Sequence, residues 1–290
     1  MKIVFWSHVR GQCGTTMHMA SIAVAQALFY DSKVVLMENH DHLLNIETTL
    51  NKRRSDKYVC ETCGYNQYSL ENLMEQFSDV ESEDEERLIF RCAVSYIRDR
   101  LYYLPHGYLR NRELLDYEFS RNMPGLFGGL ERFFDTVYID TFATGCLSTK
   151  AIVDSADIVV VNLNQNKNVL DHFFCNFSML RDKALFVIGN YNPGRVFSLE
   201  QIRKKYQIPE NRLFAVPYCM EAAEAESDGG IPSFIARNYI EPSIDNREFI
   251  NEIKKISAAL HEHSRYIKYF NHHRPGFHQN VALNECVSCQ

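Results

Sequence analysis

The sequence predicts an α/β fold: a doubly wound, mainly parallel sheet. Several short apolar runs are rich in Val, Ile, Phe and Tyr and lack polar alternation, which is typical of strands buried on both faces. Helical patterns lie between the runs, and this alternation favours helices on both faces of a parallel sheet. The expected strands are residues 2–6, 33–37, 101–105, 136–140, 157–163, 184–190 and 212–217. The expected helices are residues 15–30, 165–181, 198–206 and 245–270.

Three segments depart from this alternation of strands and helices. Residues 51–68 are polar and hold a CxxC pair, so we expect an insertion there. Residues 271–290 have the character of a tail and end with a second CxxC pair. Residues 78–87 are an acidic run, which we expect to be a solvated loop and helix start. The sequence contains no evident linker, so we expect one domain over residues 1–270, followed by the tail.

Composition sets limits on the class of protein. The chain has 290 residues, of which 46% are hydrophobic, as is typical of a globular protein with a sizeable core. Its net charge of −6 gives no overall attraction to nucleic acid or anionic lipid. No apolar run approaches the ~20 residues that span a bilayer, and the N-terminus does not resemble a signal peptide. We therefore expect a cytoplasmic protein without a transmembrane segment, in which the nine cysteines are core thiols or metal ligands rather than disulfides.

The stretch FWSHVRGQCGTTMHMASIAVAQAL, residues 5–28, predicts a strand, a glycine turn and a helix. Unpaired N–H groups and the dipole at a helix N-terminus favour a phosphate, and Gly11 and Gly14 allow the backbone to curl around it. Thr15 and Thr16 open the helix, and one of their hydroxyls is available for Mg²⁺. The lysine of the pattern GxxxxGK[ST] is missing, however. Similar turns occur in sheets that bind nothing, so the loop alone leaves nucleotide binding open.

Several segments occur in an order and spacing that resemble the ParA/MinD family of P-loop ATPases, including its atypical TadZ branch. RGQCGTT (10–16) stands where that family has KGGxGKTT, and KVVLMENHDH (33–42) resembles the strand that usually ends in DLDPQ. FDTVYIDTFATG (134–145) is similar to the Walker B strand. FVIGNYNP (186–193) and FAVPYCMEAAEAESDGGIP (214–232) resemble the segments that hold the base. The resemblance covers about residues 1–260 and implies a P-loop NTPase fold that binds ATP or ADP with Mg²⁺.

The resemblance also implies roles for individual residues. It places the phosphates on the loop, Mg²⁺ on Thr16 and Asp140, and the base beside Asn190, Pro217 and Tyr218. A strand-end aspartate also commonly caps a turn, and the other three positions also suit ordinary turn chemistry. The loop residues that the resemblance assigns to cofactor binding are Gly11, Gln12, Cys13, Gly14, Thr15 and Thr16.

Departures from the family pattern affect the expected chemistry. Thr15 replaces the lysine that holds the β- and γ-phosphates, which weakens binding and weakens transition-state stabilisation more. Arg10 stands at the position of a second lysine that reaches the partner's nucleotide, and it is either a partial replacement or a solvated loop residue. Glu38 and His40 replace two aspartates. Glu38 keeps a carboxylate where the family positions the attacking water, so Glu38 and Arg10 are the candidate catalytic residues of a slow or absent ATPase.

Four cysteines have the spacing of metal ligands. Cys60 with Cys63 and Cys286 with Cys289 form two CxxC pairs, and four thiolates make a closed zinc site. Their wide separation leaves other readings open. The pairs bind metal separately or across a dimer, they hold an iron–sulfur cluster, or they are unligated thiols.

The leading functional hypothesis is an atypical ParA/MinD-like nucleotide-binding protein that forms a homodimer and positions protein partners. One alternative is an active ATPase for DNA partition, for which KRR (52–54) and RKK (203–205) are candidate DNA contacts. A second alternative is an iron–sulfur carrier that uses the CxxC pairs. The residues do not distinguish ATP from GTP.

Overall fold

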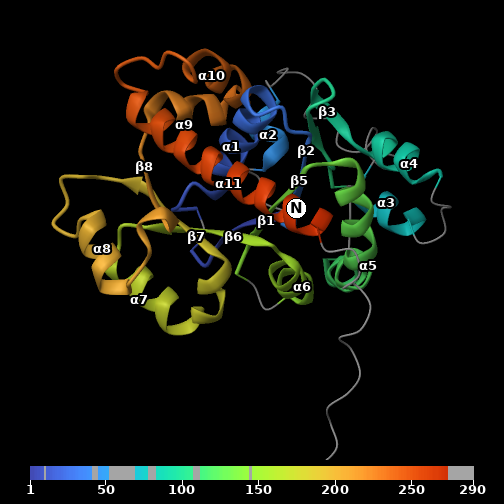
Figure 1. The fold of residues 1–290 in the computed structure, drawn as a ribbon, viewed down its shortest axis with the longest axis horizontal. Coiled ribbons are helices and arrows are strands. Elements are labelled where there is room, and N and C mark those ends of the chain that lie inside the picture. Colours follow the sequence, from blue (N-terminus) through green and yellow to red (C-terminus); the bar gives the residue numbers. More distant parts are fainter. Residues whose placement is uncertain are drawn as a thin grey trace, which may run out of the picture.

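The computed structural model describes residues 1–9, 11–40, 45–51, 69–77, 83–106, 112–143 and 146–273, with side chains at all of these except 112, 114, 115 and 267–273. Eight strands form one sheet in the order β3-β4-β2-β5-β1-β6-β7-β8 (Figure 1). All neighbouring strands are parallel except β3 and β4. The strands are β1 (Lys2–Ser7), β2 (Val34–Glu38), β3 (Val94–Ile97), β4 (Leu101–Tyr103), β5 (Thr136–Phe142), β6 (Ile158–Asn164), β7 (Ala184–Tyr191) and β8 (Leu213–Pro217).

Helices cover both faces of this sheet (Figure 1). One face packs against α3 (Leu70–Phe77), α4 (Glu85–Cys92), α5 (Arg112–Phe133), α6 (Leu147–Ser155), α7 (Lys167–Asn176) and α8 (Leu199–Tyr206). The other packs against α1 (Thr15–Phe29), α2 (Ile46–Leu50), α9 (Met220–Ser227), α10 (Ile231–Asn238) and α11 (Arg247–His273). Short 3₁₀ turns, η1 (Ser178–Lys183) and η2 (Glu210–Arg212), precede β7 and β8.

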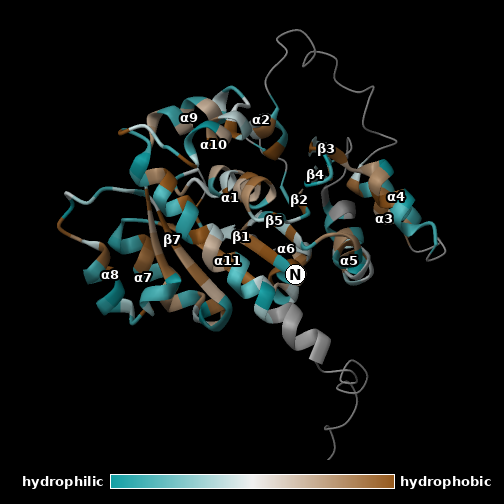
Figure 2. Cartoon of the chain, turned by 45° about the horizontal axis from the view of Figure 1, so that its top comes forward, coloured by the Kyte–Doolittle hydropathy of each residue, from teal (hydrophilic) through white to brown (hydrophobic). Residues whose placement is uncertain are grey.

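Successive strand residues alternate between two hydrophobic cores. In β1, Val4 and Trp6 face the α3–α8 side, whereas Ile3 and Phe5 face the α1 side. Figure 2 shows β1 and β7 as mainly hydrophobic and α8 as largely hydrophilic. A strand that is apolar on both faces is stable only when both faces are covered, which explains the apolar runs in the sequence.

The predicted fold class is confirmed, and each of the seven expected strands is present. Several details differ. The antiparallel edge strand β3 and the helices α2, α3, α5, α6, α9 and α10 were not expected, and the expected helix 165–181 is α7 followed by η1. The last helix continues to His273, three residues into the expected tail. Among the described residues, none of the helices combines the length and the apolar character that a membrane span requires.

The topology brings three strand ends together. β5 lies between β1 and β2, with Phe5 opposite Asp140 on one side and Glu38 opposite Asp140 on the other. Because these strands are parallel, their carboxyl ends meet at one edge of the sheet, where α1 also begins. In open α/β sheets, ligands bind at this edge.

Candidate functional site

The loop before α1 carries main-chain N–H groups that meet no acceptor among the described residues. Gly11 and Gly14 adopt left-handed backbone conformations, with φ of 69° and 65°. The first main-chain bond into α1 runs from His18 N to the Gly14 oxygen, at 2.8 Å. No described residue accepts a hydrogen bond from the N–H groups of residues 11–17. A curled loop with several such donors at a helix N-terminus is a favourable place for an anion.

A second feature of the loop is its close contact with β7 and β6. A Cβ atom placed on Gly189 would lie 2.2 Å from the main-chain oxygen of Cys13. Asn190 donates its side-chain amide to the main-chain oxygen of Gln12 at 3.2 Å, and Asn164 donates to the Gln12 side chain at 3.1 Å. The ends of β7 and β6 therefore hold the loop from one side.

The two loop glycines provide a matched prediction. Alanine at either position must adopt positive φ, which costs about 1 kcal/mol. At Gly14 the new Cβ also lies 3.1 Å from His18 Nε2, whereas at Gly11 it meets nothing within 4 Å. We expect Gly11→Ala to lower the free energy of unfolding by about 1 kcal/mol and Gly14→Ala by about 2 kcal/mol, measured by urea unfolding.

Gly128→Ala in α5, where a Cβ meets nothing within 4 Å, is the control and should be neutral or slightly stabilising. Equal losses for Gly11→Ala and Gly14→Ala would contradict the contact between Gly14 and His18.

His18 supports the loop from inside the protein. It is buried, and its Nδ1 lies 2.9 Å from the side-chain oxygen of Asn162. Because that oxygen accepts, Nδ1 carries the proton, and Nε2 faces Gly14. Burial lowers the pKa of His18 to about 4, so the ring is neutral near pH 7.

This buried histidine predicts a pH dependence of stability. Between pH 4 and 6.5 the unfolded chain binds a proton at this position and the folded chain does not, so the free energy of unfolding falls as pH falls. Relative to a His18→Gln variant, the wild-type protein should lose about 2 kcal/mol between pH 7 and pH 5. Urea unfolding of both proteins at the two pH values measures this difference, and parallel pH profiles would contradict it. The wild-type protein has to be compared with the His18→Gln variant because the pKa of Glu226 is raised to about 7, and this group makes the free energy of unfolding fall as pH rises.

Asp140 of β5 contacts two polar side chains, those of Thr16 and His40. The Thr16 hydroxyl donates to Asp140 Oδ2 at 2.6 Å, and His40 Nε2 lies 3.3 Å from the same oxygen. Burial alone would lower the pKa of His40, but Asp140 and Glu38 together raise it above its ordinary value. The hydroxyl and the carboxylate are the hard oxygen ligands that Mg²⁺ uses when phosphates and waters complete its shell.

Glu38 is more deeply buried than its predicted catalytic role requires. It is 2% exposed, accepts hydrogen bonds from the Tyr103 hydroxyl and, at 3.1 Å, from Ile46 N, and burial raises its pKa. Both carboxyl oxygens are thus engaged inside the protein. A carboxyl group whose two oxygens already accept hydrogen bonds inside the protein is poorly placed to take a proton from a water molecule.

Glu226 of α9 adds a third carboxyl group to this neighbourhood. Burial and the negative charge of Asp140 raise its pKa to about 7. It therefore releases its proton near neutral pH, and in its charged form it opposes an anion at the site.

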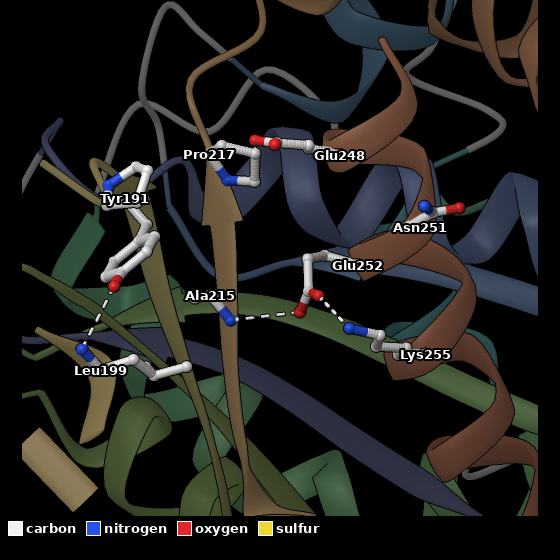
Figure 3. A pocket seen from close by; sticks show the side chains of 9 residues that line it. Tyr191, Leu199, Ala215, Pro217, Glu248, Asn251, Glu252 and Lys255 are labelled. Atoms are coloured by element: carbon white, nitrogen blue, oxygen red, sulfur yellow. Dashed lines mark hydrogen bonds and ion pairs between the residues drawn. The ribbon is translucent and has the colours of Figure 1, made fainter. Parts of the chain in front are cut away.

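A pocket of about 330 Å³ lies between the carboxyl ends of β7 and β8 and the first turns of α11 (Figure 3). Tyr191 and Pro217 line one side, and Asn251 and Glu252 line the other. Figure 3 shows Glu252 joined to the main chain of Ala215 and to Lys255. Of the three residues predicted to contact the base, only Pro217 lines this pocket. Asn190 faces Gln12 instead, and Tyr218 is 62% exposed.

Other predicted site residues are not placed by the structure. Arg10, the KRR stretch and the four cysteines Cys60, Cys63, Cys286 and Cys289 lie outside the described residues. Within the described ranges, His, Cys, Asp and Glu form no group of three or more that suits a metal ion. The zinc hypothesis therefore stays a prediction.

The second basic stretch is described. Arg203 and Lys204 pair with Glu200, and Lys205 pairs with Asp171. These partners reduce the positive charge that α8 offers to DNA.

Several residues at the site were not assigned roles by the sequence. Gly189, His18, Glu226 and His106 contact or surround the predicted residues only through the fold. A glycine at the end of a predicted strand can mark a close backbone approach, so Gly189 was the one detectable signal. The others belong to runs that resemble ordinary core or surface sequence.

Comparison with solved structures identifies the class of this fold. The sequence matches no protein-family model and no curated protein at a significant level. The fold is nevertheless that of doubly wound P-loop NTPases. A ParA family ATPase from Chlorobium tepidum TLS superposes with a TM-score of 0.66 at 12% identity, covering 90% of this chain and 98% of that one.

Within that class, the fold is of the ParA/MinD type. MinD from Pyrococcus horikoshii OT3, complexed with Mg-ADP, gives a TM-score of 0.63 at 15% identity and covers 90% of this chain and 96% of its own. The MinC:MinD complex of Aquifex aeolicus gives a TM-score of 0.60 at 14% identity and covers 89% of this chain and 96% of that one.

Proposed function

We propose that this protein is an atypical ParA/MinD-like nucleotide-binding protein that binds ATP or ADP with Mg²⁺. The observation that carries the proposal is the loop of residues 11–17, whose N–H groups have no described acceptor. The structural neighbour complexed with Mg-ADP has the same fold and supports this assignment. The phosphates then lie on the loop N–H groups, and the base would take the pocket beside Pro217, whose lining residue Tyr191 directly follows Asn190, which bonds to Gln12 of the loop.

Thr16 and Asp140 are the residues that would hold Mg²⁺, which neutralises phosphate charge when bound. His40 contacts the same Asp140 oxygen as Thr16 and helps to orient the carboxylate. Because Thr15 replaces the phosphate-binding lysine and Glu38 is fully engaged, we propose that hydrolysis is slow or absent. The nucleotide then acts by favouring one conformation of the protein rather than by being hydrolysed.

We further propose that the protein forms a homodimer through this edge of the sheet and positions partner proteins there. Leu147 after β5, and Tyr218 and Met220 after β8, are more than half exposed at the carboxyl ends of their strands. Exposed apolar side chains along the carboxyl edge of the sheet favour a protein interface there. The neighbour solved as a MinC:MinD complex supports a protein partner of this kind.

The test is a titration of the full-length protein with fluorescently labelled ATP and ADP, with and without Mg²⁺, alongside phosphate release and light scattering. We expect saturable binding that Mg²⁺ strengthens, a nucleotide-dependent rise in mass, and phosphate release close to a heat-inactivated control. Asp140→Ala should remove the effect of Mg²⁺. Absence of binding and of thermal stabilisation at 1 mM nucleotide (about tenfold above a weak Kd of 0.1 mM) contradicts the proposal. Rapid phosphate release that Asp140→Ala abolishes favours the active ATPase instead.

A further inference from the structure

A row of alternating acidic and histidine side chains leads from α3 to the candidate site. In order, its members are Glu71, His106, Glu38, His40 and Asp140. His106 Nδ1 lies 2.9 Å from Glu71 Oε1, and His106 Nε2 bonds to the main-chain oxygen of Glu38. His40 Nε2 then lies 3.9 Å from Glu38 Oε2 and 3.3 Å from Asp140 Oδ2. The row connects a helix outside the nucleotide loop with the carboxylate that Thr16 contacts.

The partners of His106 fix its protonation. A main-chain oxygen can only accept, so Nε2 carries a hydrogen, and the Glu71 carboxylate accepts from Nδ1. The side chains of His106 and Glu71 are only 19% and 9% exposed, respectively. Burial alone would lower the pKa of His106, but the hydrogen bond and charge of Glu71, together with Glu38, raise it. His106 is therefore a charged imidazolium that bridges α3 and β2.

The hydrogen bond from His106 to the Glu38 main-chain oxygen lies next to the residues that lead to His40. Glu38 ends β2, and His40 follows two residues later. Between them, Asn39 N donates to the Asp140 main-chain oxygen at 2.8 Å, and the Asn39 side chain bonds to Ser148 at 3.1 Å and Thr149 at 3.2 Å. Hydrogen bonds to β5 and α6 therefore hold the stretch from Glu38 to His40 on one side. On the other side, the bond from His106 connects this stretch to Glu71 of α3.

The start of α3 is joined to the same region. Leu70 N donates to the Pro105 oxygen at 2.8 Å, and His106 is the next residue. A displacement of α3 therefore moves Glu71 and the chain that carries His106 together.

We propose that His106 is a positioning residue, held by Glu71, which acts through the main chain of Glu38 to keep His40 against Asp140. Where it concerns nucleotide affinity, this inference rests on the proposed function. In this arrangement α3 is coupled to the site, and anything that displaces α3 alters the position of His40.

The first test needs no nucleotide. Imidazole ¹H–¹⁵N spectra of the full-length, histidine-labelled protein, assigned with His40→Gln, report the surroundings of His40. We expect the His40 signals to shift in Glu71→Gln and His106→Ala. They should stay unchanged in Arg132→Gln, which breaks the ion pair with Glu85 between α5 and α4 without touching β2. Unchanged His40 signals in both row variants overturn the inference, whether or not nucleotide binds.

The second test is a double-mutant cycle on labelled-ATP affinity. His106→Ala should weaken binding about tenfold, and His106→Gln, which keeps an N–H donor for the Glu38 oxygen, should recover most of the loss. If His106 acts through His40, the double variant His106→Ala/His40→Gln binds no more weakly than His40→Gln alone. Additive losses, or failure of His106→Gln to recover affinity, overturn the inference. Absence of nucleotide binding in the wild-type protein contradicts the proposed function only, and the imidazole spectra then decide the inference.

Discussion

Gly189→Ala is expected to abolish nucleotide binding and to lower the free energy of unfolding by about 3 kcal/mol. The added Cβ would lie 2.2 Å from the main-chain oxygen of Cys13 and 3.0 Å from the His18 ring. Main-chain atoms cannot yield as the end of a flexible side chain does, so the loop itself must move. A displaced loop no longer presents its N–H groups in the geometry that the phosphates need, so binding is lost.

Gly194→Ala, in the connection that follows the same strand, is the matched control. Its nearest neighbour is the side-chain oxygen of Asn192 at 3.2 Å, and we expect a change within about 0.5 kcal/mol. Titration with labelled ATP and urea unfolding measure the two effects. Wild-type affinity in Gly189→Ala would show that the loop does not rest on β7 as described.

Thr15→Lys is expected to strengthen ATP binding by about 30- to 100-fold, or about 2 to 3 kcal/mol. Thr15 is the first residue of α1, next to loop N–H groups to which no described residue offers an acceptor, and an ammonium group there reaches the phosphates. Among the described residues around the site, Asp140, Glu38 and Glu226 contribute carboxyl groups, so added positive charge should have a large effect.

Thr15→Met separates the charge from the added length and should leave affinity close to wild type. Adenosine, which lacks phosphates, should show no gain with Thr15→Lys. Calorimetric titration with ATP, ADP and adenosine measures these differences. An equal gain for adenosine, or for Thr15→Met, would contradict a phosphate contact.

The sequence predicted the parts of this fold whose signal is local. Every strand buried on both faces was recognisable as an apolar run, and the turn before α1 was recognisable by Gly11 and Gly14. The edge strand β3 has only four half-exposed or exposed residues and pairs across a bulge, so its pattern is weak. Helix α5 contains Pro124 and three glycines, which disfavour a helix locally. Its formation depends on packing, since Phe77 of α3 occupies the space that a side chain at Gly129 would fill.

The candidate site was predictable only in part for a similar reason. Thr16 and Asp140 were expected together, and the structure brings them to 2.6 Å. Glu38 was expected to face a water molecule, but its surroundings depend on Tyr103 and Ile46, which no motif connects with it. His106 reaches the site by strand order, because β4 lies beside β2. Register between distant segments, which fixes such contacts, has no signature within either segment.

The bond between Glu252 and the main chain of Ala215 has a consequence for self-association. β8 is the last strand of the sheet, and an exposed last strand can recruit a strand of another molecule and begin a fibrillar aggregate. Here a carboxylate from α11 takes up the outward N–H group, and the helix lies alongside the strand. This bond removes a donor from the open side of β8, which disfavours pairing of β8 with a strand of another copy of the protein.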